Sequence, residues 1–152
     1  MESKQSGFTL IEILIVLSIF LIISSITSIF LKPQYLWYEK ERFFSQFKAD
    51  ILYTQQYAIS HQKQLSLHIF PKEKRYTVKE KTTGKSVIER ELPQSIQIEK
   101  GTLATPGLAY MIIEFSPNGR LNRFGNFYFL VDYERYKITF QIGAGRFYVV
   151  KE

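Results

Sequence analysis

The sequence reads Gly7-Phe8-Thr9-Leu10-Ile11-Glu12 near its start, and this stretch leads directly into an apolar run that ends at Leu31. Glu12 is the only charged side chain among residues 8–31. An α-helix over these 24 residues measures about 36 Å at about 1.5 Å per residue, enough to cross a hydrocarbon core of about 30 Å. The run therefore predicts a membrane-spanning helix that follows a short polar leader over residues 1–7.

Three interpretations of this helix differ in how they account for Glu12. A secretory signal has a shorter apolar run with small residues at its cleavage site, whereas this run lacks alanine and continues into Lys32 and Pro33. A plain, uncleaved anchor fits the length but leaves a carboxylate in lipid, at a cost of about 2–4 kcal/mol. Cleavage between Gly7 and Phe8 resolves this cost, because the new amine of a neighbouring subunit's Phe8 can then neutralise the Glu12 carboxylate.

The motif resembles the class III signal of type IV pilins and pseudopilins. In that family the prepilin peptidase cuts after the glycine and methylates the new N-terminal phenylalanine, and the glutamate drives filament assembly. The resemblance implies that Gly7 and Phe8 are the processing residues, with Phe8 N-methylated, and that Glu12 is the assembly residue. It implies a single-pass protein of the cell membrane that later joins a cell-surface filament. The implied partners are other major and minor pilin subunits, the prepilin peptidase, the pilus assembly platform and, before assembly, the membrane.

Residues 38–62 have the pattern of an amphipathic helix. Phe44, Phe47, Ile51 and Ala58 recur at helical spacing and form one apolar stripe. Further apolar residues are expected to widen this stripe: Phe43, Leu52, Tyr53 and Ile59. A stripe this wide predicts that the helix packs on a sheet. We therefore expect four segments: a leader at 1–7, a transmembrane or filament-core helix at 8–31, its amphipathic continuation at 32–62, and a β-rich head at 63–152.

The sequence period changes to two after His61, which is typical of strands with one buried face. Strands are expected at 65–69, 75–80, 86–91, 96–98, 111–115, 127–131, 138–142 and 146–150. Ser116-Pro117-Asn118-Gly119 has the residues of a type I turn, and Gly143 to Gly145 indicate another turn. Sequential strands with short connections predict an antiparallel meander. The expected fold class is α+β, with a long N-terminal helix packed on an antiparallel sheet.

Two further stretches extend the resemblance toward particular subunits. The pattern Ile113-x-Phe115-x-Pro117-x-Gly119, with Gly125 and the later strands, resembles minor pseudopilins of the GspH and FimT type. The helix stretch Tyr53–Ser60 is similar to competence minor pilins of Gram-positive bacteria. This likeness implies a minor subunit of a competence type IV pilus, required for binding and uptake of extracellular DNA in natural transformation. Two alternatives stay open: a pseudopilin of a type II secretion-like system, and an uncleaved single-pass anchor that carries a basic β binding head.

The chain carries a formal net charge of +6 and has a sequence pI near 9.4, which suits an acidic partner. Arg120 and Arg123 flank the predicted turn with no acid between them, so they are the favoured contacts for extracellular DNA. A second candidate group surrounds the hairpin after the first strand, where Lys72, Lys74 and Arg75 are followed by Lys79, Lys81 and Lys85. Neighbouring glutamates lower the net positive charge of this group. The alternative is that all of these cations simply keep an aromatic-rich domain soluble.

The residue types and their spacing give little support to an enzymatic function. The chain contains no cysteine, and its two histidines, His61 and His68, have no nearby pair of carboxylates with which to form a metal site. Thr83-Gly84-Lys85-Ser86 matches the end of a phosphate-binding loop, but Lys79 stands where that loop requires glycine. We expect no catalytic residue, no metal and no cofactor.

Overall fold

The computed structural model describes residues 8–104, 106–141 and 146–152. One helix, α1 (Leu10–His61), precedes the β-structure. The chain forms two compact units, residues 1–38 and residues 39–152, and we call the second unit the head. The strands of the described residues are β1 (Leu65–Phe70), β2 (Arg75–Glu80), β3 (Ser86–Glu91), β4 (Ile96–Glu99), β5 (Met111–Phe115), β6 (Gly125–Val131), β7 (Glu134–Phe140) and β8 (Phe147–Lys151).

In the first unit, α1 presents apolar side chains to its surroundings on every side. Leu10, Val16 and Phe20 are each more than 60 % exposed, and the other large apolar residues up to Ile26 are about half exposed or more. A helix that is apolar all round has no solvated face. Within the described ranges, no helix combines the length and the hydropathy expected of a membrane span.

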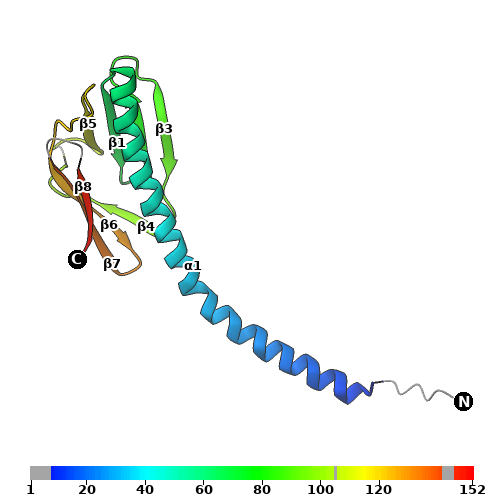
Figure 1. Ribbon diagram of the computed structural model, residues 1–152. Coiled ribbons are helices and arrows are strands. Elements are labelled where there is room, and N and C mark those ends of the chain that lie inside the picture. Colours follow the sequence, from blue (N-terminus) through cyan, green and yellow to red (C-terminus); the bar gives the residue numbers. More distant parts are fainter. Residues whose placement is uncertain (1–7, 105, 142–145) are drawn as a thin grey trace, which may run out of the picture. The chain divides into compact units, whose positions relative to one another are not determined.

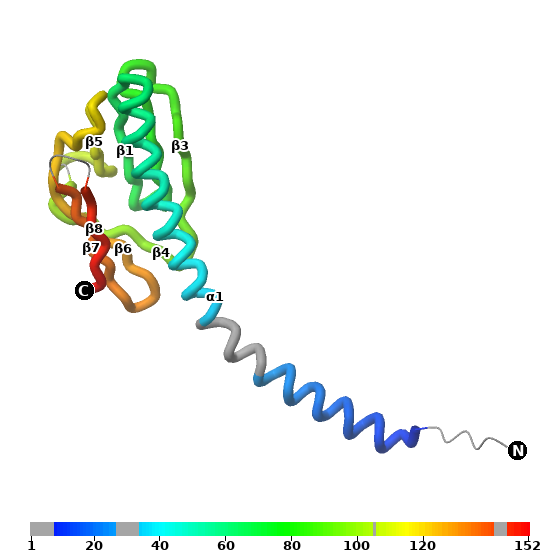
Figure 2. Tube along the Cα trace, viewed as in Figure 1, coloured from blue at the N-terminus to red at the C-terminus, as the bar shows by residue number. Residues whose placement is uncertain are grey.

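The head contains two antiparallel sheets (Figures 1 and 2). Sheet A has the order β3-β2-β1-β5, and sheet B has the order β4-β6-β7-β8. The prediction of one continuous meander is therefore wrong. β1-β2-β3 and β6-β7-β8 are meanders, but β5 returns to pair with β1, and β4 pairs with β6. Turn residues specify only local neighbours, whereas these two pairings join segments far apart in sequence.

The part of α1 that belongs to the head packs against both sheets. The Phe47 ring is edge-on to Tyr76 of β2 at 5.2 Å and to Phe129 of β6 at 5.3 Å, measured between ring centroids. Three of the four residues of the predicted stripe, Phe47, Ile51 and Ala58, are buried in the core, and Phe44 is partly buried against it. Phe43, which was predicted to widen the stripe, is also buried. The prediction that Leu52, Tyr53 and Ile59 widen the stripe is wrong, because these three side chains are 38–52 % exposed. Their positions on the helix turn them away from the sheets.

A buried carboxylate, Asp50, takes the place of an apolar residue on the stripe. It accepts hydrogen bonds from the Tyr76 hydroxyl at 2.7 Å, the Arg90 Nε at 3.1 Å and the Gln46 amide at 2.7 Å. Because Tyr76 lies on β2 and Arg90 on β3, these bonds tie the helix to two strands. Burial and the bond to Asp50 raise the pKa of Tyr76. The buried acid is thus fully hydrogen-bonded, as burial of a charge requires.

A second buried acid, Glu80, joins the end of α1 to the turn after β2. Its side chain is 2 % exposed and accepts hydrogen bonds from Thr83 Oγ1 at 2.7 Å, Lys63 Nζ at 2.9 Å and the Tyr57 hydroxyl at 3.0 Å. The hydrogen bonds from Thr83 and Lys63 are the main reasons why the pKa of Glu80 is lowered to about 2. The folded chain therefore favours the ionised carboxylate.

We expect this carboxylate to make the head acid-sensitive. A depressed folded-state pKa contributes stability above the ordinary value of 4.5, and this contribution is lost as the pH falls from 4.5 toward 2. Urea unfolding of the full chain in detergent, at pH 7 and pH 3, should show a larger loss of stability for the wild type than for Glu80→Gln. Glu91→Gln is the matched control, because Glu91 is exposed at the end of β3. Equal pH dependence in wild type and Glu80→Gln would contradict the prediction.

Candidate functional site

The first candidate site is the start of α1, where Thr9 and Glu12 bond to each other. Glu12 Oε2 accepts hydrogen bonds from the Thr9 backbone N–H at 2.7 Å and from Thr9 Oγ1 at 2.8 Å. In return, the Glu12 backbone N–H donates to Thr9 Oγ1 at 3.3 Å. This reciprocal pattern is a capping box, which satisfies amide donors that the first turn of a helix leaves unpaired. The Thr-x-x-Glu spacing signals such a box, so Thr9 belongs to this candidate site although the sequence reasoning did not single it out.

The surroundings of Glu12 are apolar. A shallow groove of about 420 Å³ along the helix is lined by Phe8, Glu12, Ile13, Ile15 and Val16. Phe8 is 84 % exposed, and Gly7 lies outside the described residues. Glu12 therefore has a partner inside its own chain, yet its carboxylate opens onto a groove whose other lining side chains are hydrophobic. A second apolar helix laid in that groove would cover the carboxylate.

The second candidate site concerns the basic residues of the head, which the structure separates into two groups. Phe70 pairs with Arg75 at one end of the β1–β2 hairpin, whereas Leu65 pairs with both Glu80 and Phe115 at the other end. Six residues of extended strand span about 17 Å. Lys72, Lys74 and Arg75 therefore lie at one end of sheet A, and Lys81, Lys85 and Arg120 lie at the other. We call these the Lys72 end and the Arg120 end.

Most of the positive charge at the Lys72 end is engaged within the chain. Arg75 pairs with Glu73 at 2.6 Å and with Glu89 at 3.1 Å, and its guanidinium lies 4.6 Å from the centre of the Phe70 ring. Lys74 donates to the backbone carbonyl of Gln94 at 2.8 Å. Of the three predicted contacts at this end, Arg75 is therefore paired with two acids, Lys74 is bonded to a backbone carbonyl, and Lys72 is exposed.

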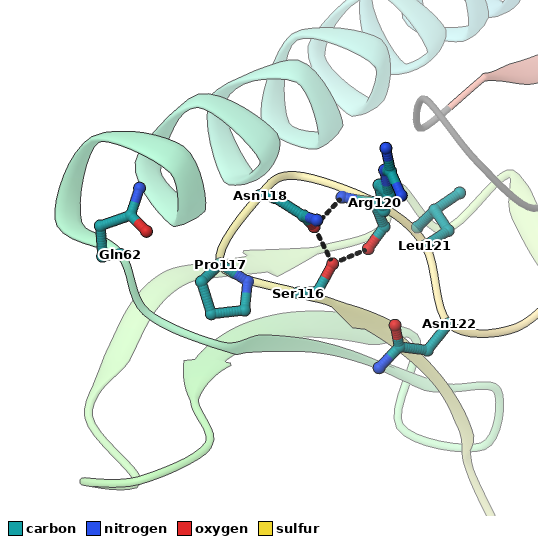
Figure 3. Close-up of a pocket in the computed structure, with 7 residues that line it drawn as sticks. All are labelled: Gln62, Ser116, Pro117, Asn118, Arg120, Leu121 and Asn122. Carbon is teal, nitrogen blue, oxygen red and sulfur yellow. Dashed lines mark hydrogen bonds between the residues drawn. The ribbon is translucent and has the colours of Figure 1, made fainter.

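The Arg120 end holds an open polar pocket of about 510 Å³, which Figure 3 shows. Its lining combines one cationic side chain, four neutral side chains that can form hydrogen bonds and two apolar ones: Gln62, Ser116, Pro117, Asn118, Arg120, Leu121 and Asn122. Arg120 is exposed there, whereas Arg123 is only half exposed and follows on the same connection. The two predicted arginines therefore differ in exposure. Three amide side chains that the sequence reasoning missed also line the pocket with Arg120.

Local backbone geometry fixes the two segments that border this pocket, the end of α1 and the turn at residues 116–119. α1 ends because Gln62 adopts a left-handed conformation with φ 53°, and Lys63 N–H donates to the Ala58 carbonyl at 3.1 Å. The predicted turn is present, since Gly119 N–H donates to the Ser116 carbonyl at 2.8 Å. The Gln55 side chain of α1 donates to the Gly119 carbonyl at 3.1 Å and so anchors the turn to the helix.

The two histidines make local contacts. His61 stacks on Tyr57 with 4.0 Å between ring centroids, and its Nδ1 lies 2.9 Å from Ser60 Oγ. His68 lies 2.9 Å from Ser66 Oγ, and burial together with the nearby Lys79 charge lowers its pKa. In the part of the chain that the structure describes, no group of three or more histidine, aspartate or glutamate side chains could hold a metal ion.

Known proteins share both the N-terminal motif and the fold described above. The family described as the prokaryotic N-terminal methylation motif matches residues 3–28. The fold resembles that of the minor pseudopilin EpsH of Vibrio cholerae (TM-score 0.53, 15 % identity, 70 % of this chain and 91 % of that chain). It also resembles the fold of the type IV minor pilin FimU of Pseudomonas aeruginosa PAO1 (TM-score 0.54, 14 % identity, 70 % of this chain and 84 % of that chain). The predicted α+β fold is therefore confirmed as the fold of minor pilins and pseudopilins.

Similarity to one protein narrows the class from minor pilins and pseudopilins in general to a single family. The competence protein ComGD of Bacillus subtilis strain 168 is 33 % identical to this chain over 144 residues, which cover 95 % of this chain and 92 % of ComGD. The chain belongs to the ComGD family of type IV pilin-like proteins. The resemblance of the N-terminal motif to type IV pilins is thereby confirmed, as is the likeness to competence minor pilins.

Proposed function

We propose that this protein is a minor pilin-like subunit of a competence type IV pilus, required for binding and uptake of extracellular DNA in natural transformation. The observation that carries the proposal is the single carboxylate, Glu12, in an otherwise uncharged apolar run directly after Gly7-Phe8-Thr9. That motif is joined to a head with the fold of minor pilins. Similarity to a competence protein favours a competence filament over a secretion filament.

The proposed precursor has a leader at residues 1–7 and a single membrane-spanning helix at residues 8–31. Residues 32–62 continue the helix, and residues 63–152 form the β-rich head. Prepilin peptidase cuts between Gly7 and Phe8 and methylates Phe8. The mature helix then leaves the membrane by packing against other pilin subunits at the assembly platform, and the head faces outward. The role is structural and involves no catalysis.

Assembly supplies the Glu12 carboxylate with a positive partner. In the isolated chain Glu12 bonds to Thr9, which satisfies helix amides but brings no opposite charge. An apolar environment strengthens attraction between opposite charges and penalises an unpaired one. The amine of Phe8 on a neighbouring subunit would therefore be held firmly beside Glu12 once two helices enclose the apolar groove.

Two measurements test the proposal. Mass spectrometry of the protein isolated from cells should find methylated Phe8 as the first residue, whereas an intact leader would favour the uncleaved anchor. Transformation frequency should then fall sharply in a deletion strain and return on complementation. Normal transformation together with loss of an exported protein from the medium would instead favour the secretion pseudopilin.

A further inference from the structure

The Arg120 end of sheet A differs from the rest of the head in its charge. Three connections meet there, residues 62–64, 81–85 and 116–123, and they contain no aspartate or glutamate. Their cations are Lys63, Lys81, Lys85, Arg120 and Arg123. Two carboxylates at the adjoining strand ends pair with two of them, Glu80 with Lys63 at 2.9 Å and Glu114 with Lys81 at 2.7 Å. Positive charge is thus in excess at this end.

The pocket beside Arg120 places hydrogen-bond donors within that positive end. Arg120 contributes a guanidinium, and Gln62, Asn118 and Asn122 contribute side-chain amides (Figure 3). The Gln62 amide already donates to the Ile59 carbonyl at 2.7 Å, and the Asn122 side chain hydrogen-bonds to the Glu114 carboxylate. Asn118 Oδ1 lies 2.5 Å from Ser116 Oγ and 3.4 Å from the Arg120 backbone nitrogen, both of which can donate to it. The Arg120 backbone N–H donates to this oxygen, which leaves the exposed NH₂ group of Asn118 on the pocket side of the turn. Among the described residues that line the pocket none carries a carboxylate, and the nearest acid identified by its contacts is Glu114, which bonds to Asn122.

The turn that carries these groups is preorganised. Ser116 N–H and Oγ each lie 2.8 Å from the Arg120 carbonyl. Gly119 has φ 73°, and a Cβ placed there would lie 2.7 Å from Ile59 Cδ1, so the turn sits closely against α1. A ligand therefore meets donors that are already positioned, which lowers the entropic cost of binding.

We propose that this pocket binds a phosphodiester group of the DNA backbone. Arginine together with asparagine and glutamine side chains is the set with which proteins contact DNA phosphates. A guanidinium matches the phosphate oxygens in a two-pronged geometry. In this proposal Arg120 makes that contact, and the Asn118 amide donates to a remaining oxygen. These contacts carry no base information, so the pocket binds DNA without regard to sequence. This inference rests on the proposed function, because it presupposes that the chain meets DNA.

Charge-matched variants at the two ends of sheet A test the assignment. The full chain is purified in detergent, and its affinity for a fluorescent DNA duplex is measured by anisotropy at several salt concentrations. Arg120→Gln should weaken binding about tenfold at 0.1 M salt and lower the slope of log K against log salt by about one. Lys72→Gln removes the same charge at the Lys72 end and should leave both quantities near those of the wild type. Circular dichroism checks that both variants fold.

A second variant and a competitor sharpen the test. Asn122→Asp places a carboxylate in the pocket and should weaken DNA binding at least as much as Arg120→Gln does. Poly-L-glutamate at equal charge should compete poorly with the duplex, because its carboxylates do not reproduce the phosphodiester. Equal affinities for Arg120→Gln and Lys72→Gln would overturn the assignment, as would competition by poly-L-glutamate equal to that by unlabelled DNA.

Failure of the pocket can be told apart from failure of the proposed function. The affinity is measured on purified protein, and transformation is measured in a deletion strain. If Arg120→Gln binds DNA as the wild type does while deletion abolishes transformation, the phosphate pocket is overturned and the competence role stands. Weakened DNA affinity in Arg120→Gln, with normal transformation after deletion, would support the pocket and overturn the competence role.

Discussion

Replacing Glu12 with alanine is expected to leave cleavage after Gly7 largely intact and to reduce incorporation into filaments by about tenfold or more. The variant leaves the Phe8 amine of a neighbouring subunit without a partner in an apolar helix bundle. An unpaired buried charge costs several kcal/mol, and each 1.4 kcal/mol is about a factor of ten in an equilibrium. The measurement compares the mature subunit in sheared filaments with that left in membranes.

Glu12 has two roles that alanine removes together, and two further variants separate them. Glu12→Gln keeps a side-chain oxygen that can cap the Thr9 amide but carries no charge, because glutamine also completes a capping box. Thr9→Ala keeps the charge but removes the hydroxyl that bonds to Glu12 Oε2 at 2.8 Å. If charge pairing drives assembly, Glu12→Gln should fail nearly as severely as Glu12→Ala, and Thr9→Ala should retain much of its incorporation. Normal filament levels for Glu12→Gln would contradict charge pairing and leave helix capping as the role of Glu12.

Phe129→Ala should be the most damaging single truncation in the head. The ring is fully buried, and its centroid lies 4.9 Å from that of Phe43, 5.0 Å from that of Phe127 and 5.3 Å from that of Phe47. It therefore joins sheet B to α1. Truncation of a buried phenylalanine to alanine costs about 3–5 kcal/mol, whereas domains of this size are stable by about 5–15 kcal/mol. Urea unfolding of the full chain in detergent should show the loss as a lower midpoint.

Phe124→Ala provides the matched control for that truncation. The chemical change is identical, but Phe124 is 69 % exposed, so its free energy of unfolding should stay within about 0.5 kcal/mol of the wild type. A similar midpoint for both variants would show that the contact between sheet B and the helix contributes little to the stability of the head.

Local patterns predicted the elements well because their causes are local. Alternation at Leu65, Leu67 and Ile69 indicated β1, and those three side chains are fully buried. The Pro117–Gly119 turn was likewise predicted from residues whose backbone preferences suit it. The predicted turn at 143–145 lies outside the described residues.

The candidate sites were predictable to different degrees. The motif around Glu12 was read from six consecutive residues, although the bond to Thr9 needed the structure. The basic residues were judged by their closeness in sequence, which grouped Lys72 with Lys81 although strand β2 places them at opposite ends of sheet A. The pocket combines Gln62 with residues 116–122, and no pattern in the sequence links a helix end to a turn more than fifty residues later.

The sequence by itself determined the two features that follow from the solvent preference of neighbouring residues: an apolar N-terminal helix with one acid, and an amphipathic helix followed by short strands. Only the tertiary structure decided which strands pair across long separations, which face of α1 is covered, and where positive charge accumulates. The physical reason is that hydrophobic burial is non-directional. It specifies which side chains leave water, whereas their partners are fixed by the packing of the whole head.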